Sequence, residues 1–244
     1  QLTGICTAPP AEVVQKETAG ADRYATALAS SAESFPNGAG AVVIATGEKF
    51  PDALGGSALA GVLDAPILLS RSSALSAGVV AEVQRLGATE VYVLGSSAAL
   101  SPAVQTALAD VVGAENVHRI GGANRYITAN AVAAKVIELR GGSYDGKAFV
   151  ATGEGFTDAL AASPIATADG RPVYLAPRGG ITAGTLAAMQ VAGVTDCVIL
   201  GGETAIPAGT SAAISGAGMT VMRINGADRY ETAAKIAEYG VTDC

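Results

Sequence analysis

The chain has 244 residues, of which 50% are hydrophobic and 15% are charged, so it is able to bury a core and is not disordered. Its net charge of −7 and the scatter of its basic residues argue against nucleic acid as a partner. No apolar run reaches the roughly 18 residues of a membrane-spanning helix, so we expect no transmembrane span.

Helices and strands are expected to alternate strictly through the first half of the chain. The expected helices cover residues 13–35, 52–63, 76–86, 102–112 and 125–139. The expected strands cover residues 41–45, 66–70, 91–94 and 117–120. These strands are continuous runs of valine, isoleucine and leucine, which indicates a parallel sheet with helices on both faces and right-handed crossovers.

The second half of the chain repeats the first. Residues 45–54 recur as residues 151–160, and residues 66–69 match residues 172–175. The repeat predicts an α/β fold of two tandem doubly wound (Rossmann-like) parallel-sheet modules plus an N-terminal helix. The expected division is an N-terminal segment with the leading helix at 1–39, a first module at 40–145 and a second module at 146–244.

A Gly-Ala-Asp/Asn-Arg-Tyr element occurs three times, at residues 20–27, 122–129 and 226–233. Units that began at this element would leave the third copy as a lone helix. Units that begin at the strand near residue 40 leave over only the leading helix, which can cover an exposed face, so we prefer this division. The expected helix caps are Asp22, Asn124 and Asp228.

An arginine and a tyrosine follow each cap. They are Arg23 and Tyr24, Arg125 and Tyr126, and Arg229 and Tyr230. An arginine in the first turn opposes the helix dipole and therefore needs a partner. One interpretation is a bidentate pair with an acidic loop, which would clamp one unit to the next. The other is that these side chains, with Arg119 and Arg223, line a groove for an anionic polymer; we favour the clamp.

A Thr-Gly-Glu-x-Phe-x-Asp loop follows the first strand of each unit. Its side chains are Thr46, Glu48 and Asp52 in the first copy and Thr152, Glu154 and Asp158 in the second. Ligands bind at such strand ends in open α/β sheets, and backbone N–H groups there can hold an anion. The acidic residues argue against this, so we predict that the aspartates cap the following helix and close the loop.

Catalytic and metal-binding patterns are weak. The single histidine, His118, lies in an expected strand where the repeat has Met222, so we expect a packing role. We therefore expect no catalytic residues, no metal and no cofactor. Cys197 begins an apolar run and is expected to be a buried free thiol, whereas Cys6 and Cys244 near the chain ends are candidates for a disulfide.

Four segments carry a resemblance to a known family. They are residues 119–129, 151–160, 172–175 and 199–202. Together they resemble the cell wall binding repeat 2 family of Gram-positive bacteria. The resemblance implies a secreted protein held non-covalently on the cell wall by an anionic glycopolymer, such as a teichoic-acid-like polymer or a phosphorylated polysaccharide. If the binding groove lies between modules, a two-module chain would complete it as a homo-oligomer.

Three functional hypotheses follow. The first is a non-catalytic surface protein that is anchored to anionic wall polymer through the arginine and tyrosine helix starts and the acidic loops. The alternative is a structural subunit of a self-assembling surface layer or filament, in which the same helix starts contact other proteins. The third is an enzyme acting on wall polysaccharide, for which Glu154 would have to be essential. An acidic chain conflicts with an anionic ligand unless basic side chains gather locally.

Overall fold

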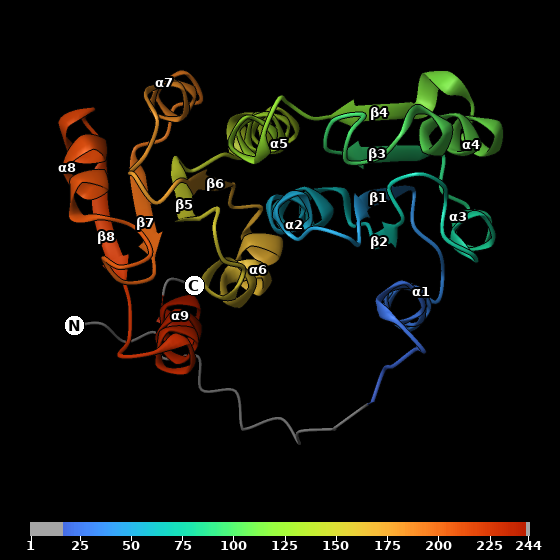
Figure 1. The fold of residues 1–244 in the computed structure, drawn as a ribbon, viewed down its shortest axis with the longest axis horizontal. Helices are drawn as coiled ribbons and strands as arrows, with labels where there is room; N and C mark the ends of the chain where they lie inside the picture. Colours follow the sequence, from blue (N-terminus) through green and yellow to red (C-terminus); the bar gives the residue numbers. More distant parts are fainter. Residues whose placement is uncertain (1–16, 243–244) are drawn as a thin grey trace.

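Two four-stranded parallel sheets form the framework of the computed structural model, which describes residues 17–242 (Figure 1). The first sheet contains β1 (Ala41–Thr46), β2 (Ile67–Ser70), β3 (Glu90–Leu94) and β4 (Val117–Ile120). The second contains β5 (Lys147–Thr152), β6 (Val173–Ala176), β7 (Asp196–Leu200) and β8 (Thr220–Ile224). Their orders are β2-β1-β3-β4 and β6-β5-β7-β8. The predicted pair of doubly wound modules is confirmed.

Helices connect the strands. They are α1 (Arg23–Ser34), α2 (Pro51–Leu63), α3 (Val79–Leu86), α4 (Pro102–Val112), α5 (Arg125–Arg140), α6 (Thr157–Asp169), α7 (Ala183–Val191), α8 (Ala208–Gly216) and α9 (Arg229–Thr242). Two short 3-10 helices are η1 (Ala114–Asn116) and η2 (Gly141–Ser143). The helix predicted from residue 13 begins only at Arg23, because Asp22 is extended and caps it. The helix predicted from residue 76 begins at Val79, after Gly78 at φ +86°.

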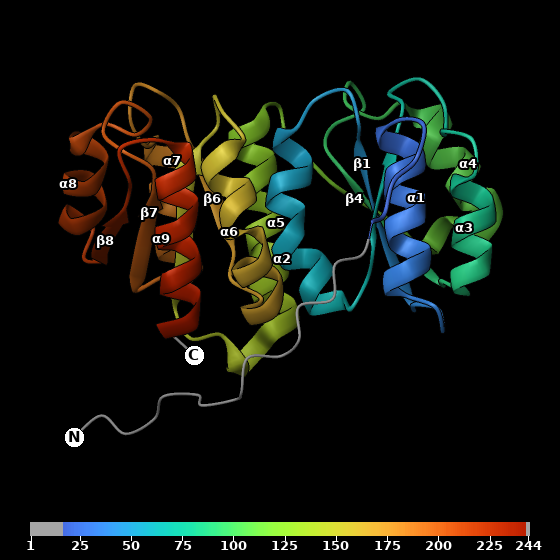
Figure 2. The same ribbon diagram turned by 90° about the horizontal axis from the view of Figure 1, so that it is seen from below.

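The helices form three layers around the two sheets. Between the sheets lie α2, α5 and α6, while α3 and α4 cover the outer face of the first sheet and α7 and α8 that of the second (Figure 1). Seen from below, α9, α6, α2 and α1 form a row (Figure 2). Strand β1 sends Val43 inward and Val42 and Ile44 outward, so both faces of the sheet are buried as predicted.

One hydrophobic cluster joins the two modules. It contains Val43 of β1, Leu59 of α2, Val132 of α5, Phe149 of β5 and Leu175 of β6. Because the modules share this core, α5 packs on α2 of the first module and also on β6 and α7 of the second. The division at residues 40–145 and 146–244 stays a prediction.

Helix α1 is fastened by a buried carboxylate. Glu82 of α3, which is 7% exposed, accepts the Ser31 hydroxyl at 2.6 Å and two hydrogen bonds from Arg85 at 2.7 and 2.8 Å. The bonds from Arg85, with the smaller contribution of Ser31, hold the pKa of Glu82 below its usual range. The leading helix packs on α3 and on β2, and its Leu28 joins the hydrophobic cluster of the first sheet, so it covers a face of that sheet as expected.

The structure shows the surroundings of the Cys197 thiol and of the His118 imidazole. Cys197 is 1% exposed and free, as predicted, and burial raises the pKa of its thiol to about 12. His118 stacks on Tyr92 with ring centroids 5.0 Å apart, and its Nε2 atom lies 2.5 Å from a carboxylate oxygen of Glu90. Cys6 and Cys244, the candidate disulfide, lie outside the described residues.

Candidate functional site

The loop after β1 folds back on its own threonine. The Oγ1 atom of Thr46 accepts the N–H of Glu48 at 3.2 Å. The Glu48 carboxylate accepts two hydrogen bonds from Ser72, from its N–H at 2.9 Å and from its hydroxyl at 2.7 Å. These bonds lower the pKa of Glu48. The carboxylate is therefore ionised, and it already accepts hydrogen bonds from Ser72.

The loop after β5 makes the same turn with a different partner. The Oγ1 atom of Thr152 accepts the N–H of Glu154 at 3.1 Å. The Glu154 carboxylate then accepts the Tyr126 hydroxyl at 2.7 Å. Burial and this bond raise the pKa of Tyr126 to about 12, so the phenol stays protonated at neutral pH.

The arginine and tyrosine of the helix start hold the loop glycine. In the first copy, Arg23 Nη1 donates to the carbonyl of Gly47. The Tyr24 ring lies so close that a Cβ on Gly47 would be 2.5 Å from its Cε1 atom. The second copy makes the same contacts with Arg125, Gly153 and Tyr126. The motif therefore needs glycine at this position because a tyrosine ring takes the space of its side chain.

The predicted acceptor for these arginines is wrong. Arg23 and Arg125 donate to backbone carbonyls and not to the carboxylates of the acidic loops. The Arg125 bond nevertheless joins α5 to the loop after β5 and so links the two modules. Arg229 has no hydrogen bond or ion pair within residues 17–242, and Tyr230 is 79% exposed.

The predicted caps of the three helix starts are confirmed. Asp22 accepts the N–H groups of Tyr24 and Ala25 at 2.9 and 2.8 Å. The corresponding residues Asn124 and Asp228 make the same bonds. Sequence reasoning missed a second contact, in which Thr26 Oγ1 accepts the Gly20 N–H at 3.0 Å. Thr128 and Thr232 repeat it, which explains the constant threonine of the motif.

Asp52 and Asp158 do not cap their helices, contrary to the prediction. Helix α2 begins after Phe50 and α6 after Phe156, and neither has a side-chain cap. Proline at the first position of α2 has no N–H, so this helix start has one free donor fewer to satisfy. Both aspartates lie in the first turn, where their charge still suits the helix dipole.

The two aspartates have similar surroundings, since Asp52 lies against Gly95 and Asp158 against Gly201. Asp52 is partly buried beside Gly95, and burial raises its pKa although Arg125 and Lys49 oppose this. Asp158 is 8% exposed, and burial likewise raises its pKa, against a hydrogen bond from Thr157.

Arg119 and Arg223 donate hydrogen bonds within their own modules. Arg119 of β4 donates to the Gly95 carbonyl and to the Gln105 side chain, both at 2.9 Å. Arg223 of β8 donates to the Gly201 carbonyl at 2.7 Å. Burial lowers the pKa of both guanidinium groups. These arginines fix the loops after β3 and β7, and neither lines a pocket at the strand ends.

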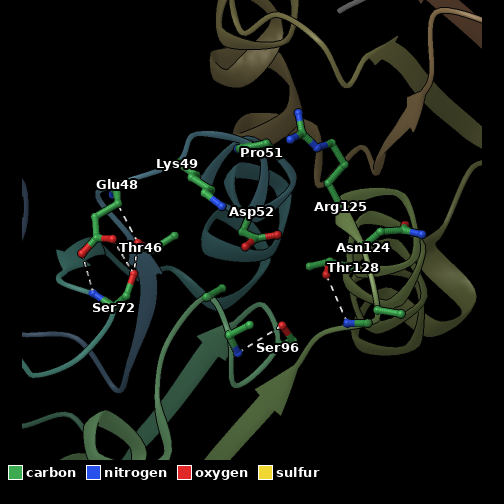
Figure 3. A pocket seen from close by; sticks show the side chains of 14 residues that line it. Thr46, Glu48, Lys49, Pro51, Asp52, Ser72, Ser96, Asn124, Arg125 and Thr128 are labelled. Atoms are coloured by element: carbon green, nitrogen blue, oxygen red, sulfur yellow. Dashed lines mark hydrogen bonds between the residues drawn. The ribbon is translucent and has the colours of Figure 1, made fainter.

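A pocket of 410 Å³ opens at the carboxyl ends of β1 and β3, where the strand order reverses (Figure 3). We call it the strand-end pocket. It is lined by Thr46, Glu48, Lys49, Pro51, Asp52, Ser72, Ser96, Ala98, Ala99, Gly122, Ala123, Asn124, Arg125 and Thr128. Hydroxyl, amide, carboxylate and cationic groups meet here.

The pocket combines predicted and unpredicted residues. Of the predicted site it collects Thr46, Glu48, Asp52 and Arg125. Sequence reasoning missed Lys49, Ser72, Ser96, Asn124 as a lining residue, and Thr128. Their position directly after parallel strands, or in the first turn of the following helix, is the signal that could have found them.

The second module has a smaller pocket at the equivalent place, with a volume of 370 Å³. It is lined by Thr152, Glu154, Gly155, Arg178, Thr204 and Ala205. Arg178 stands where the first module has Ser72. Within residues 17–242 no group of three or more metal-binding side chains occurs, and no helix is long and apolar enough to cross a membrane.

Sequence comparisons extend over most of the chain. The family described as Cell wall binding domain 2 matches residues 18–105 and 119–211. The chain is 30% identical to the N-acetylmuramoyl-L-alanine amidase LytC of Bacillus subtilis (strain 168), over 91% of this chain and 42% of the relative. It is 32% identical to the amidase enhancer of the same organism, over 89% of this chain and 28% of the relative.

Solved structures show the same fold. Cwp6 from Clostridium difficile matches with a TM-score of 0.84 and 28% identity, over 97% of this chain and 39% of that chain. Cwp8 from Clostridium difficile matches with a TM-score of 0.77 and 25% identity, over 89% and 36%. The chain thus spans less than half the length of each of these relatives. It is a repeat protein of the cell wall and cell surface, and it belongs to the Cell wall binding domain 2 family.

Proposed function

We propose that this chain is a secreted, non-catalytic module that anchors a protein by binding an anionic wall glycopolymer, of the teichoic-acid-like or phosphorylated polysaccharide kind. Wall binding follows from the family. The observation that carries the finer proposal is the strand-end pocket, where Lys49 and Arg125 stand beside hydroxyl and amide side chains. Cations attract the anionic groups, and hydroxyl and amide groups match those of a sugar or polyol.

The strand-end pocket is less acidic than the whole chain, because its lining matches two cations, Lys49 and Arg125, with two carboxylates, Glu48 and Asp52. Glu48 stays ionised, its carboxylate accepts both hydrogen bonds from Ser72, and the cations that act on it are Arg71 and Lys49. Lys49 has no hydrogen bond or ion pair in the described part of the chain, and Arg125 uses only one of its nitrogens on Gly153. Net charge is a sum, and these two cations act locally on a bound anion.

A binding role rather than catalysis fits the residues at the site. The lining of the strand-end pocket has no histidine or cysteine. His118 lies in β4, stacked on Tyr92 and bonded to Glu90. The Glu154 carboxylate, the candidate for wall hydrolysis, is held by the Tyr126 hydroxyl. The pocket therefore offers recognition groups without an activated nucleophile.

Co-sedimentation with purified Gram-positive cell walls tests the anchoring function. We expect the protein to pellet with intact walls, to release as salt rises, and to stay in solution with walls from which anionic polymers have been extracted. Equal pelleting with intact and extracted walls would contradict the proposal.

A second role in assembly is favoured by the outer face of α9. Tyr230 is 79% exposed and Val241 74% exposed, and Ala237 is exposed. At the position matching Ala237, Ala133 of α5 is 1% exposed, in the helix that packs on β6 and α7. We propose that this face of α9 packs on a module of a second copy.

Light scattering at increasing protein concentration tests this assembly role. The wild-type protein should associate, and Tyr230→Asp should remain monomeric, because a charge in place of the most exposed aromatic side chain of this face opposes burial. A wild-type protein that stays monomeric at about millimolar concentration, far above the dissociation constants of typical specific complexes, would exclude the role.

A further inference from the structure

Most hydrogen-bond acceptors of the strand-end pocket are already occupied. The occupied acceptors are Glu48 (from Ser72), Thr46 Oγ1 (from the Glu48 N–H), Asn124 Oδ1 (from the N–H groups of Tyr126 and Ile127), Thr128 Oγ1 (from the Gly122 N–H) and Ser96 Oγ (from the Ala98 N–H). Each of these bonds fixes a loop or a helix start. A ligand would have to displace protein structure to use them as its main acceptors.

The carboxylate of Asp52 is the exception. It has no hydrogen bond or ion pair among residues 17–242, although it is partly buried. In Figure 3 it lies in the middle of the pocket, with Lys49 on one side and the start of α5 at Asn124 and Thr128 on the other. A partly buried carboxylate without a hydrogen-bond donor is costly, unless a bound molecule or water supplies one.

The glycine opposite keeps this space open. Gly95 has φ +95°, and a Cβ there would lie 2.6 Å from Asp52 Oδ2. The backbone conformation and the close approach both require glycine at this position. Asp52 therefore lies against the loop after β3. The lone pairs of its carboxylate remain available to accept hydrogen bonds from a molecule in the pocket.

The free donors of the pocket are the hydroxyls of Ser96 and Thr128 and several cationic or amide groups. Lys49 is unpaired in the described part of the chain, Arg125 keeps donors beyond its bond to Gly153, and Asn124 keeps its Nδ2 amide. An occupant that matches the whole pocket must therefore accept at the cations and donate at Asp52. A phosphodiester between sugars or polyols does both, because its phosphate oxygens accept and its neighbouring hydroxyls donate.

We infer that the Asp52 carboxylate is the specificity-determining group of the strand-end pocket, accepting hydrogen bonds from hydroxyls of a polymer unit whose phosphate is held by Lys49 and Arg125. This inference rests on the proposed anchoring function. It explains why a binding site for an anion contains a carboxylate. Asp52 repels a phosphate that has no hydroxyl beside it, but it accepts a hydrogen bond when the ligand carries a hydroxyl next to its phosphate.

Acidification should weaken this recognition. The charged groups that face Asp52 are Glu48 and Lys49 on its own loop and Arg125 on α5, and the loop after β3 presents only the uncharged Ser96. Burial raises the pKa of Asp52, whereas the bonds from Ser72 lower that of Glu48. As pH falls from neutral, Asp52 is therefore protonated at a higher pH than an ordinary aspartate, and its carboxylate then loses acceptor capacity.

The test compares Asp52→Asn with Asp110→Asn, which makes the same change of charge at an exposed position of α4. We expect Asp52→Asn to weaken pelleting with intact walls about tenfold, as for a lost charged hydrogen bond, and Asp110→Asn to leave it unchanged. Thermal melting of both variants checks folding. Unchanged or tighter wall binding by a folded Asp52→Asn protein would overturn the inference.

Two measurements on the wild-type protein need no variant. Glucose 1-phosphate or glycerol 3-phosphate should compete for wall binding, and the stronger of the two distinguishes a sugar from a polyol unit. Inorganic phosphate and free glucose at the same concentration should compete less. Equal competition by all four, or binding that does not weaken on acidification, would overturn the inference. A wild-type protein that fails to pellet with intact walls would instead refute the anchoring function.

Discussion

Replacing Gly61 by leucine is expected to lower the melting temperature of the protein strongly. A Cβ on Gly61 of α2 would lie 2.0 Å from the carbonyl oxygen of Thr167 of α6, and this contact is with backbone that cannot rotate away. The same crossing is fixed by the Thr167 hydroxyl, which donates to the Ser57 carbonyl at 3.1 Å. Leucine must therefore push the two helices apart and open the shared core.

The expected cost is about 3 kcal/mol or more, at the upper end for overpacked sites, which corresponds to a fall in melting temperature of roughly 6–12 °C. Differential scanning calorimetry measures it. Gly55→Ala, in the same helix, is the matched control because its Cβ would meet only Ala129 Cα, at 3.9 Å. That variant should be neutral or stabilised by about 0.5–1 kcal/mol, since alanine is the better helix former. A Gly61→Leu protein as stable as wild type would show that the modules do not share a core.

The order of strands and helices was predictable because each element carries a local signal. Continuous apolar runs such as Val42 to Ala45 lie in buried parallel strands, and Gly87 with φ +66° ends α3 where the sequence pattern ends it. The leading helix was predicted too long because its apolar pattern continues beyond its cap. The cap at Asp22 decides where α1 begins.

No local sequence pattern predicts which residues of the two modules contact each other. Gly61 in the middle of a predicted helix is unfavourable by propensity, and that cost indicates a packing constraint without naming the partner Thr167. The acceptors of Arg23 and Arg125 were predicted as carboxylates because a sequence identifies acidic side chains but does not indicate which backbone carbonyl lies nearby. Their real acceptors are backbone carbonyls, which every residue has.

The candidate site was predictable as a region and not as a set of residues. Topology alone places the loops after β1 and β3 at one edge of the sheet, so Thr46, Glu48 and Asp52 were found. Ser72 and Ser96 come from loops without a repeated motif. The role of Asp52 was misjudged because an aspartate near a helix start is usually a cap, and here the cap position, Phe50, lies two residues earlier.

Arg125→Ala should weaken wall binding and stability together, because the guanidinium lines the strand-end pocket and also donates to Gly153. Loss of the charged hydrogen bond is expected to cost about 1.5–3 kcal/mol of stability. Loss of a cation at the ligand should weaken binding about tenfold or more and make it less sensitive to salt. Calorimetry and wall pelleting measure the two effects.

Arg23→Ala separates the two roles. Arg23 makes the same bond, to Gly47, but does not line the strand-end pocket. It should therefore lower the melting temperature and leave wall binding intact. Arg125→Lys gives the complementary result, since lysine keeps the charge at the pocket but cannot reproduce the guanidinium geometry, so stability should fall more than binding. If Arg23→Ala and Arg125→Ala weaken wall binding equally, the arginines act only as clamps and the polymer binds elsewhere.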